Sequence, residues 1–213
     1  MSRMFRARML PMSEEQQKTE EIVSIEKKPK EKIKEKKSQS AWELVRFGVI
    51  ALLVVLGIRT FIVQPFIVSG SSMVPTFQNR EYLIIDEVSY KFNAPQRDDV
   101  VVFKYPNDTK KFFIKRIIGL PNEIVDIKDG DVTITNNENK EGFKLREPYV
   151  KNTSNSNAHF VLKNDEYFVM GDNRPASSDS RYWGALNKKL LIGKVLLRLW
   201  PINKIDVLPG DYK

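Results

Sequence analysis

The hydrophobic pattern of the chain changes twice along its 213 residues. Residues 1–40 are charged and poor in aromatic side chains, whereas residues 41–63 are mainly apolar. From residue 80 onward, β-branched and aromatic residues occur in short runs. The pattern predicts a disordered or frayed tail over 1–40, a helix over 41–63 and a β-rich domain over 64–213.

The apolar segment is short for a membrane span. Its strictly apolar part, 47–58, has twelve residues, which as a helix cover roughly 18 Å of a ~30 Å hydrocarbon core. Arg46 and Arg59 can extend their charged ends to the interface, where Trp42 is also favourable. With these residues counted, about 22 residues are long enough to span. A buried core helix and a signal peptide cleaved near 68–70 are the alternatives, and we expect a retained single span.

The distribution of charge predicts how the span is oriented. Lys36, Lys37 and Arg46 flank its N-terminal end, and no basic residue lies between Arg59 and Arg80. The positive-inside rule therefore places the tail in the cytoplasm and the β-rich domain outside the cytoplasmic membrane. The net charge of +8 fits an anionic membrane surface better than nucleic acid, because the basic tail lacks interleaved aromatic residues that would stack on bases.

The β-rich domain contains several strand patterns and no long helical one. Asp129 and Gly130 form a two-residue hairpin turn between two of them, and the polar stretch 136–157 is loop-like. We expect an all-β domain, barrel-like or sandwich-like. The predicted strands are 82–86, 99–105, 111–118, 124–128, 131–135, 159–162, 166–170, 192–200 and 205–208.

The composition limits the chemistry. The chain has no cysteine and one histidine, His159, which excludes disulfides, thiol catalysis and metal sites with several histidines. We expect neither a metal nor another cofactor. His159 follows an Asn-rich loop with no carboxylate motif beside it, so we expect it to be non-catalytic. Serine chemistry would then need another base, and lysine is the usual substitute.

Two stretches contain the residues of such chemistry. Val68-Ser-Gly-Ser-Ser-Met-Val-Pro-Thr76 presents Ser72 between small residues and a proline, although by itself it is more typical of a linker than of a nucleophile. Lys115 lies in an apolar strand pattern, where an inward side chain would have a lowered pKa. Strand alternation makes Lys115 and Arg116 face opposite ways, so spacing alone favours a solvent-facing Lys115.

A third stretch, 171–184, is dense in hydrogen-bonding side chains. Asp179 and Arg181 are spaced for a structural clamp, and Ser177 for orienting a nearby amine. An ordinary turn needs only a few such residues. For most of the stretch, the expected alternative is a surface loop whose polar side chains form hydrogen bonds with one another.

Together these stretches resemble the bacterial type I signal peptidases, membrane-bound Ser-Lys proteases that remove signal peptides from secretory preproteins. The resemblance covers the span and most of residues 60–208. One departure is Arg97-Asp98-Asp99, where the family often has Arg-Gly-Asp. The matching motifs, in order, are Ser72-Met-Val-Pro-Thr76, Asp99-Val-Val-Val-Phe-Lys-Tyr-Pro106, Lys115-Arg-Ile-Ile-Gly-Leu-Pro121, Gly171-Asp-Asn-Arg174, Ser177, Asp179-Ser-Arg181 and Tyr182-Trp-Gly184.

The resemblance implies Ser72 as nucleophile and Lys115 as general base. It also implies that the backbone N–H of Ser72 stabilises the oxyanion. Some family members add a serine hydroxyl at the position of Gly70, which leaves the contributions of Gly70 and Ser71 open. The supporting residues that it implies are Ser177, which would orient the Lys115 amine, and Asp179 and Arg181, which would fix the floor of the site.

The resemblance further implies cleavage after small-x-small sites, such as Ala-x-Ala, with preproteins and the lipid bilayer as partners. A self-cleaving regulator of the same Ser-Lys type and an inactive membrane-tethered binding domain are the alternatives. The sequence does not predict an oligomeric state. The residues expected by position to line the substrate pockets are Phe66, Val68, Met73, Phe77, Val102, Phe113 and Ile114.

Overall fold

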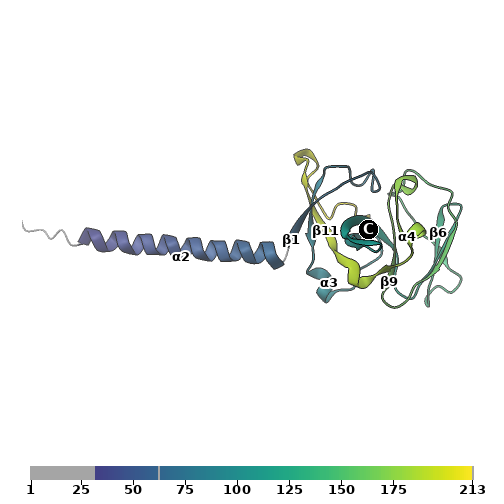
Figure 1. Cartoon of the computed structure of the whole chain (residues 1–213), viewed down its shortest axis with the longest axis horizontal. Coiled ribbons are helices and arrows are strands. Elements are labelled where there is room, and N and C mark those ends of the chain that lie inside the picture. The colour runs from purple at the N-terminus through teal and green to yellow at the C-terminus, as the bar shows by residue number, and fades with distance from the viewer. Residues whose placement is uncertain (1–31, 62, 213) are drawn as a thin grey trace, which may run out of the picture. The chain divides into compact units, whose positions relative to one another are not determined.

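The computed structural model describes residues 32–61 and 63–212 (Figure 1). Residues 1–31 of the tail predicted over 1–40 lie outside these residues. The long helix α2 spans Lys32–Phe61, so it begins within the predicted tail, and Val63 already opens a strand. Within the described ranges, no helix is long and apolar enough to cross a membrane. The chain divides into two compact units, Met1–Leu53 and Val54–Lys213.

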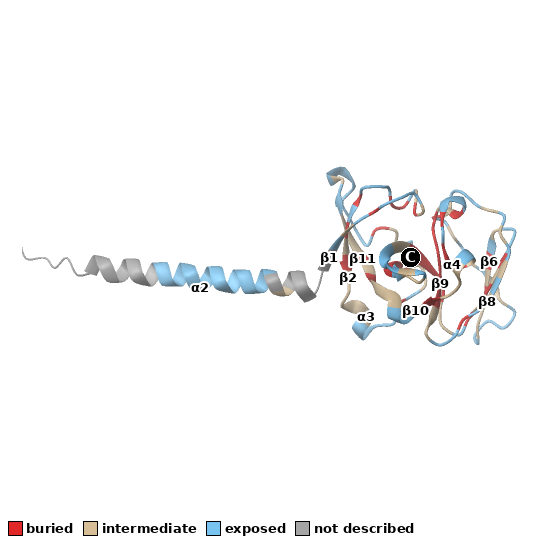
Figure 2. Ribbon diagram, in the orientation of Figure 1, coloured by how far each residue is buried: buried red, intermediate tan, exposed pale blue. Residues whose placement is uncertain are grey.

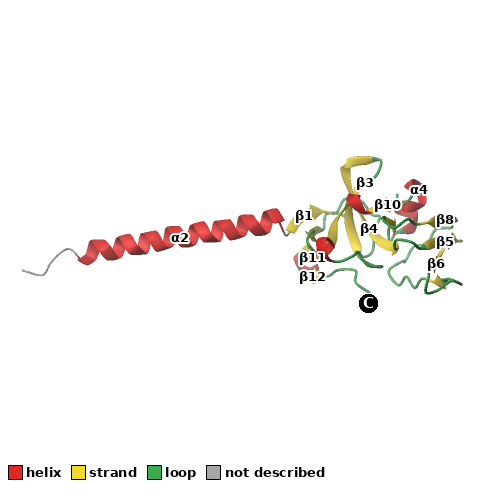
Figure 3. Cartoon of the chain, turned by 90° about the horizontal axis from the view of Figure 1, so that it is seen from below, coloured by secondary structure: helices red, strands yellow, loops and turns green. Residues whose placement is uncertain are grey.

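The second unit is built mainly from antiparallel strands (Figure 3). Its larger sheet has eight strands in the order β1-β2-β11-β3-β4-β9-β10, with β12 paired to β11. Strands that are distant in sequence, such as β2 and β11, are thereby neighbours. The strands are β1 (Val63–Ile67), β2 (Tyr82–Asp86), β3 (Val100–Tyr105), β4 (Asp108–Gly119), β9 (Glu166–Met170), β10 (Leu186–Asn187), β11 (Leu191–Trp200) and β12 (Asp206–Val207).

The smaller sheet has four strands in the order β7-β6-β5-β8. The predicted hairpin turn joins β5 to β6, and Asp129 and Gly130 both have positive φ, 50° and 89°. This conformation is the one that a two-residue hairpin turn of right-handed twist requires. The strands are β5 (Ile124–Lys128), β6 (Asp131–Thr135), β7 (Phe143–Lys144) and β8 (Ala158–Val161).

The expectation of a mainly β domain is confirmed, as two antiparallel sheets. The sequence missed β1, whose first residue it assigned to the helix, and β7 and β10, which have two residues each. Only short helices interrupt the strands. They are α3 (Ser89–Phe92), α4 (Ser180–Trp183) and the 3-10 turns η1 (Arg174–Ala176), η2 (Lys188–Leu190) and η3 (Ile202–Lys204).

Both faces of the central strand β3 are buried, because its first four residues, 100–103, are all buried. Figure 2 shows the buried residues of the described chain within the strand-rich unit, whereas the described surface of α2 is mostly exposed. Val100 and Val102 pack in one apolar cluster, whereas Val101 and Phe103 pack in another on the opposite face. β4 pairs with β3, and its residues 115–119 are buried as well. A polar side chain on either face of β4 at this level is therefore removed from water.

Candidate active site

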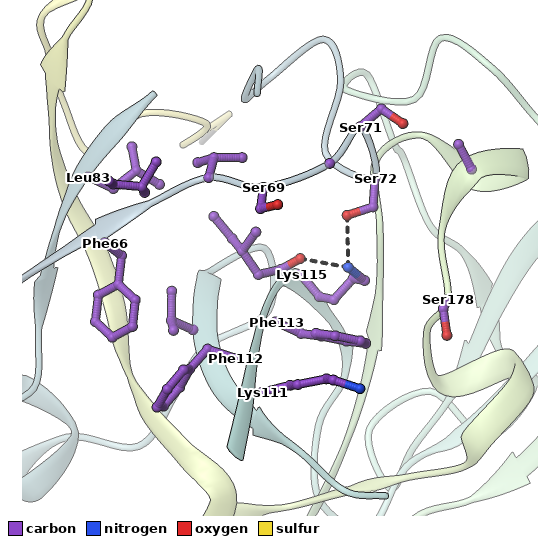
Figure 4. A pocket seen from close by; sticks show the side chains of 16 residues that line it. Phe66, Ser69, Ser71, Ser72, Leu83, Lys111, Phe112, Phe113, Lys115 and Ser178 are labelled. Atoms are coloured by element: carbon purple, nitrogen blue, oxygen red, sulfur yellow. Dashed lines mark hydrogen bonds between the residues drawn. The ribbon is translucent and has the colours of Figure 1, made fainter. Parts of the chain in front are cut away.

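Ser72 and Lys115 lie within hydrogen-bond distance of each other. Ser72 follows β1 in the small-residue segment, and Lys115 lies in β4 (Figure 4). The two atoms that meet, Lys115 Nζ and Ser72 Oγ, are 2.8 Å apart, and Nζ also lies 2.9 Å from the carbonyl oxygen of Ile114. A hydroxyl and an amine at this distance can exchange a proton directly.

Lys115 is buried, contrary to the solvent-facing position that spacing alone favoured. It is 4% exposed, and its neighbour Arg116 is fully buried. Alternation along β4 does turn the two side chains to opposite faces, but both faces are covered. Burial lowers the pKa of Lys115 from 10.5 to about 8, and the negative charges of Asp179 and Asp172 oppose this shift. The amine is therefore partly neutral near neutral pH.

The peptide around Ser72 is held by the loop that follows β9. The Asn173 backbone N–H donates to the carbonyl oxygen of Ser72 at 3.0 Å, and the Asn173 side-chain amide donates to that of Ser71 at 3.1 Å. Gly70 has φ +99° and donates its N–H to Asn79. Among the residues that the structure describes, the backbone N–H of Ser72 has no hydrogen-bond partner, so it can donate to an oxyanion.

Gly171 brings this loop close to Ser72. A Cβ at Gly171 would lie 2.7 Å from the Cβ of Ser177 and would overlap the carbonyl oxygen of Ser72. No side chain fits there without a shift of backbone, because real Cβ atoms do not approach so closely.

Ser177 is buried and 5% exposed. Its hydroxyl oxygen is buried without a hydrogen-bond partner in the part of the chain that the structure describes. The structure thus brings Ser177 close to Gly171, but it shows no hydrogen bond between Ser177 and Lys115. Its role in orienting the lysine amine stays a prediction.

The Asp179–Arg181 clamp is present. The Asp179 carboxylate accepts from Arg181 Nε at 2.7 Å and from Nη2 at 2.8 Å, and both side chains are almost fully buried. Asp179 also accepts from the Gly171 backbone N–H at 3.1 Å. Arg181 reaches Ser154 and the Arg174 carbonyl. The clamp thereby fixes Gly171.

A second buried ion pair, which the sequence did not indicate, joins the motifs to one another. Arg116 donates to both carboxylate oxygens of Asp172, at 2.9 and 2.7 Å, and Thr76 donates to Asp172 at 2.5 Å. These three residues belong to the lysine motif, the Gly171 motif and the serine motif. The sequence gives the side-chain types of these three residues, but only the fold shows that they are in contact.

A cavity of about 550 Å³ opens beside the Ser72–Lys115 pair (Figure 4). Five of the seven predicted pocket residues line it: Phe66, Val68, Val102, Phe113 and Ile114. The lining residues that the sequence missed include Leu83, Phe112, Ala176 and Ser178.

Met73 and Phe77 do not line this cavity, which corrects the prediction for both. They are 1% and 0% exposed and pack in the apolar cluster with Val68, Leu83 and Val102. The cluster supports the cavity wall from within the core, and this is why apolar residues are needed at both positions.

The family model of signal peptidase, peptidase S26, matches residues 41–200. The chain belongs to this family. The probable signal peptidase I-2 of Synechocystis is 35% identical over 187 residues, 84% of this chain and 83% of the relative. Signal peptidase I P of Bacillus subtilis subsp. natto is 33% identical over 188 residues, 82% of this chain and 97% of the relative. A solved signal peptidase I from Enterococcus faecalis is 31% identical and covers 48% of this chain and 97% of its own, with a TM-score of 0.41.

The chain is accordingly a serine peptidase of the signal peptidase I type, which removes signal peptides. This family is membrane-associated. In this peptidase, Asp98 stands where the resemblance leads one to expect glycine, and it has φ +70°. Asp tolerates the left-handed conformation better than most residues, so the turn keeps the geometry that glycine would provide.

His159 lies in β8 of the smaller sheet and does not line the cavity. The fold places a carboxylate beside it, which the sequence did not indicate: His159 Nδ1 is 2.6 Å from Asp126 Oδ1. The pair is a cross-strand neighbour pair of β5 and β8, and the His159 side chain is 63% exposed.

Proposed function

We propose that this peptidase cleaves by acyl transfer, with Ser72 as the nucleophile and Lys115 as the general base. The observation that carries this proposal is the 2.8 Å contact between Lys115 Nζ and Ser72 Oγ in a buried position that lowers the pKa of the lysine. A neutral amine can accept the hydroxyl proton, whereas an ammonium cannot.

In the first half of the reaction, Lys115 takes the proton of Ser72 Oγ as that oxygen bonds to the scissile carbonyl carbon. The negative charge that develops on the carbonyl oxygen is stabilised by the backbone N–H of Ser72. The resulting Lys115 ammonium then protonates the leaving amine as the peptide bond breaks. In the second half, Lys115 deprotonates a water molecule, which hydrolyses the Ser72 ester and restores both side chains.

The substrate is proposed to bind as an added strand. β1 pairs with β2 alone, and β4 pairs with β9 only from Arg116 onward, so residues 108–115 of β4 have one free edge. Segments 66–72 and 111–115 both line the cavity. Free strand edges bind extended peptides through backbone hydrogen bonds.

This binding mode gives a physical reason for a small-x-small preference. Alternate residues of an extended chain face the same side, so the first and third residues before the cut would both face the apolar wall. That wall is formed by bulky side chains, among them Phe66, Val102 and Ile114. It leaves little depth beside the nucleophile, and we propose that only small side chains fit.

Cleavage of a secretory preprotein by the full chain in detergent and lipid tests the proposal. The parent should cut after a small-x-small site, and Ser72→Ala should be inactive. Ser178→Ala, which also removes a hydroxyl from the cavity lining, is the matched control and should stay active. Leu or Phe at the first or third position before the cut should abolish cleavage. Normal cleavage by Ser72→Ala would refute the nucleophile, and indifference to large residues would refute the pocket.

We further propose that residues 41–63 hold the chain in the cytoplasmic membrane, with the tail inside and the catalytic domain outside. The support is the apolar surface of α2: Trp42, Leu44, Phe47 and Leu53 are each more than 60% exposed. Residues 47–58 of this helix include no charged side chain, and such a stretch is favoured in an apolar environment. Resistance to alkaline extraction, compared with a form lacking residues 1–63, would test the anchor. Full release of the intact chain would contradict it.

A further inference from the structure

A second groove, of about 470 Å³, shares Phe112 with the active-site cavity. Four lysines line it, and they come from three elements of the fold: Lys91 from α3, Lys104 from β3, and Lys188 and Lys189 from η2, between β10 and β11. Glu87 is the single acidic residue of the lining. The fold thus gathers positive charge at this place from segments up to about a hundred residues apart.

The lysines of the groove are not neutralised by the protein. Within residues 63–212, no ion pair involves any of the four. Lys91, Lys104, Lys188 and Lys189 are all exposed. Uncompensated cations around a concave surface attract an anionic ligand. In addition, the Oε1 atom of Glu87 is buried without a hydrogen-bond partner among the described residues. The lining of the groove therefore also contains an acceptor without a donor.

The rest of the lining is apolar. It comprises Tyr90, Pro95, Leu190, Leu191 and Ile192 together with the half-exposed Phe112. Phe92, next to Lys91 in α3, has 82% of its surface exposed. Large exposed aromatic side chains beside a lysine-lined groove are typical of surfaces that contact both headgroups and acyl chains.

We propose that this groove binds the headgroup of an anionic phospholipid. The four lysines would bind the phosphate, the apolar lining would contact the start of the acyl chains, and Glu87 would accept a hydrogen bond from a hydroxyl of the headgroup. A phosphatidylglycerol-type lipid has all three features. An acidic peptide matches the lysines but leaves the apolar lining and the exposed Phe92 unexplained. This inference goes beyond the proposed function, because neither the dyad nor the substrate strand uses the groove lysines.

Lipid retention by the full chain in maltoside micelles tests the proposal, measured by native mass spectrometry with dioleoylphosphatidylglycerol and with dioleoylphosphatidylcholine. The groove variant is Lys104→Gln/Lys188→Gln/Lys189→Gln. Its matched control, Lys128→Gln/Lys140→Gln/Lys151→Gln, makes the same change in charge at exposed positions outside the groove. Both variants keep the basic tail, so a difference in lipid binding between them cannot come from the tail.

We expect the parent and the control to bind phosphatidylglycerol about tenfold more tightly than phosphatidylcholine, and the groove variant to show a clearly smaller preference. Cleavage of a soluble peptide in lipid-free detergent should be equal in all three, which separates failure of this inference from failure of the catalytic proposal. Equal binding of the two lipids by the parent, or equal preference in both variants, would overturn the inference. Tighter binding of a Glu-rich decapeptide than of lipid would overturn it in favour of a polypeptide ligand.

Discussion

The lowered pKa of Lys115 predicts how cleavage depends on pH. Burial lowers this pKa from 10.5 to about 8. At pH 7 about 9% of the amine is then neutral, compared with about 0.03% for an ordinary lysine, a gain of about 300-fold. If the neutral amine is the base, kcat/KM should rise about tenfold for each pH unit below 8 and level off above it.

The assay is cleavage of a peptide with an Ala-x-Ala site by the full chain in detergent, between pH 6 and 10. Circular dichroism over the same range controls for loss of fold. A flat profile, or an inflection near 10, would refute a buried lysine base, provided that the protein stays folded throughout. An inflection near 8 in the parent, with no cleavage by Lys115→Met at any pH in this range, would support it.

The same pKa shift affects stability. Because the folded pKa of Lys115 is lowered, the unfolded chain binds one more proton than the folded chain between about pH 8 and 10.5. Stability therefore rises with pH across this window, and below pH 8 the full destabilisation of about 3 kcal/mol is present. Urea unfolding should show this rise in the parent and lack it in Lys115→Met.

Three further substitutions follow from the packing of the site. Lys115→Met should abolish cleavage yet raise the free energy of unfolding at pH 7 by up to about 3 kcal/mol; a less stable variant in urea denaturation would contradict the burial argument. Gly171→Ala should lower kcat/KM about 100-fold, because the added Cβ overlaps the carbonyl oxygen of Ser72, and unchanged kinetics in a folded variant would show that the loop shifts freely. Arg116→Met should cost about 3–5 kcal/mol by leaving the Asp172 carboxylate buried without its partner; thermal melting checks this, and Arg116→Lys should lose less.

The local sequence pattern was sufficient to predict most strands. β2 and β9 begin and end at the predicted residues, because runs of β-branched and aromatic residues between turns leave few other conformations. Asp129 and Gly130 likewise predict their hairpin from two residues. The start of β1 was assigned to the helix, because Val63 continues an apolar run and only pairing with β2 makes it a strand.

Candidate site residues could be named where they belong to a motif, but their contacts could not be predicted. Ser72 and Lys115 were identified from their motifs, but their separation of 2.8 Å results from a segment after β1 meeting β4. Met73 and Phe77 belong to the same motif region and were assigned to the pocket by position. Their place in the core depends on the direction of each side chain, which the order of residues alone does not specify.

The sequence by itself determined most of the strands, the chemical groups available for catalysis and the absence of any thiol or second histidine. These follow from composition and short-range pattern. Only the tertiary structure decided that both faces of β4 are covered, because burial depends on what packs above and below a strand. Coverage of both faces removes Lys115 from water and lowers its pKa, and this distinguishes a lysine that can act as a base from an ordinary surface lysine.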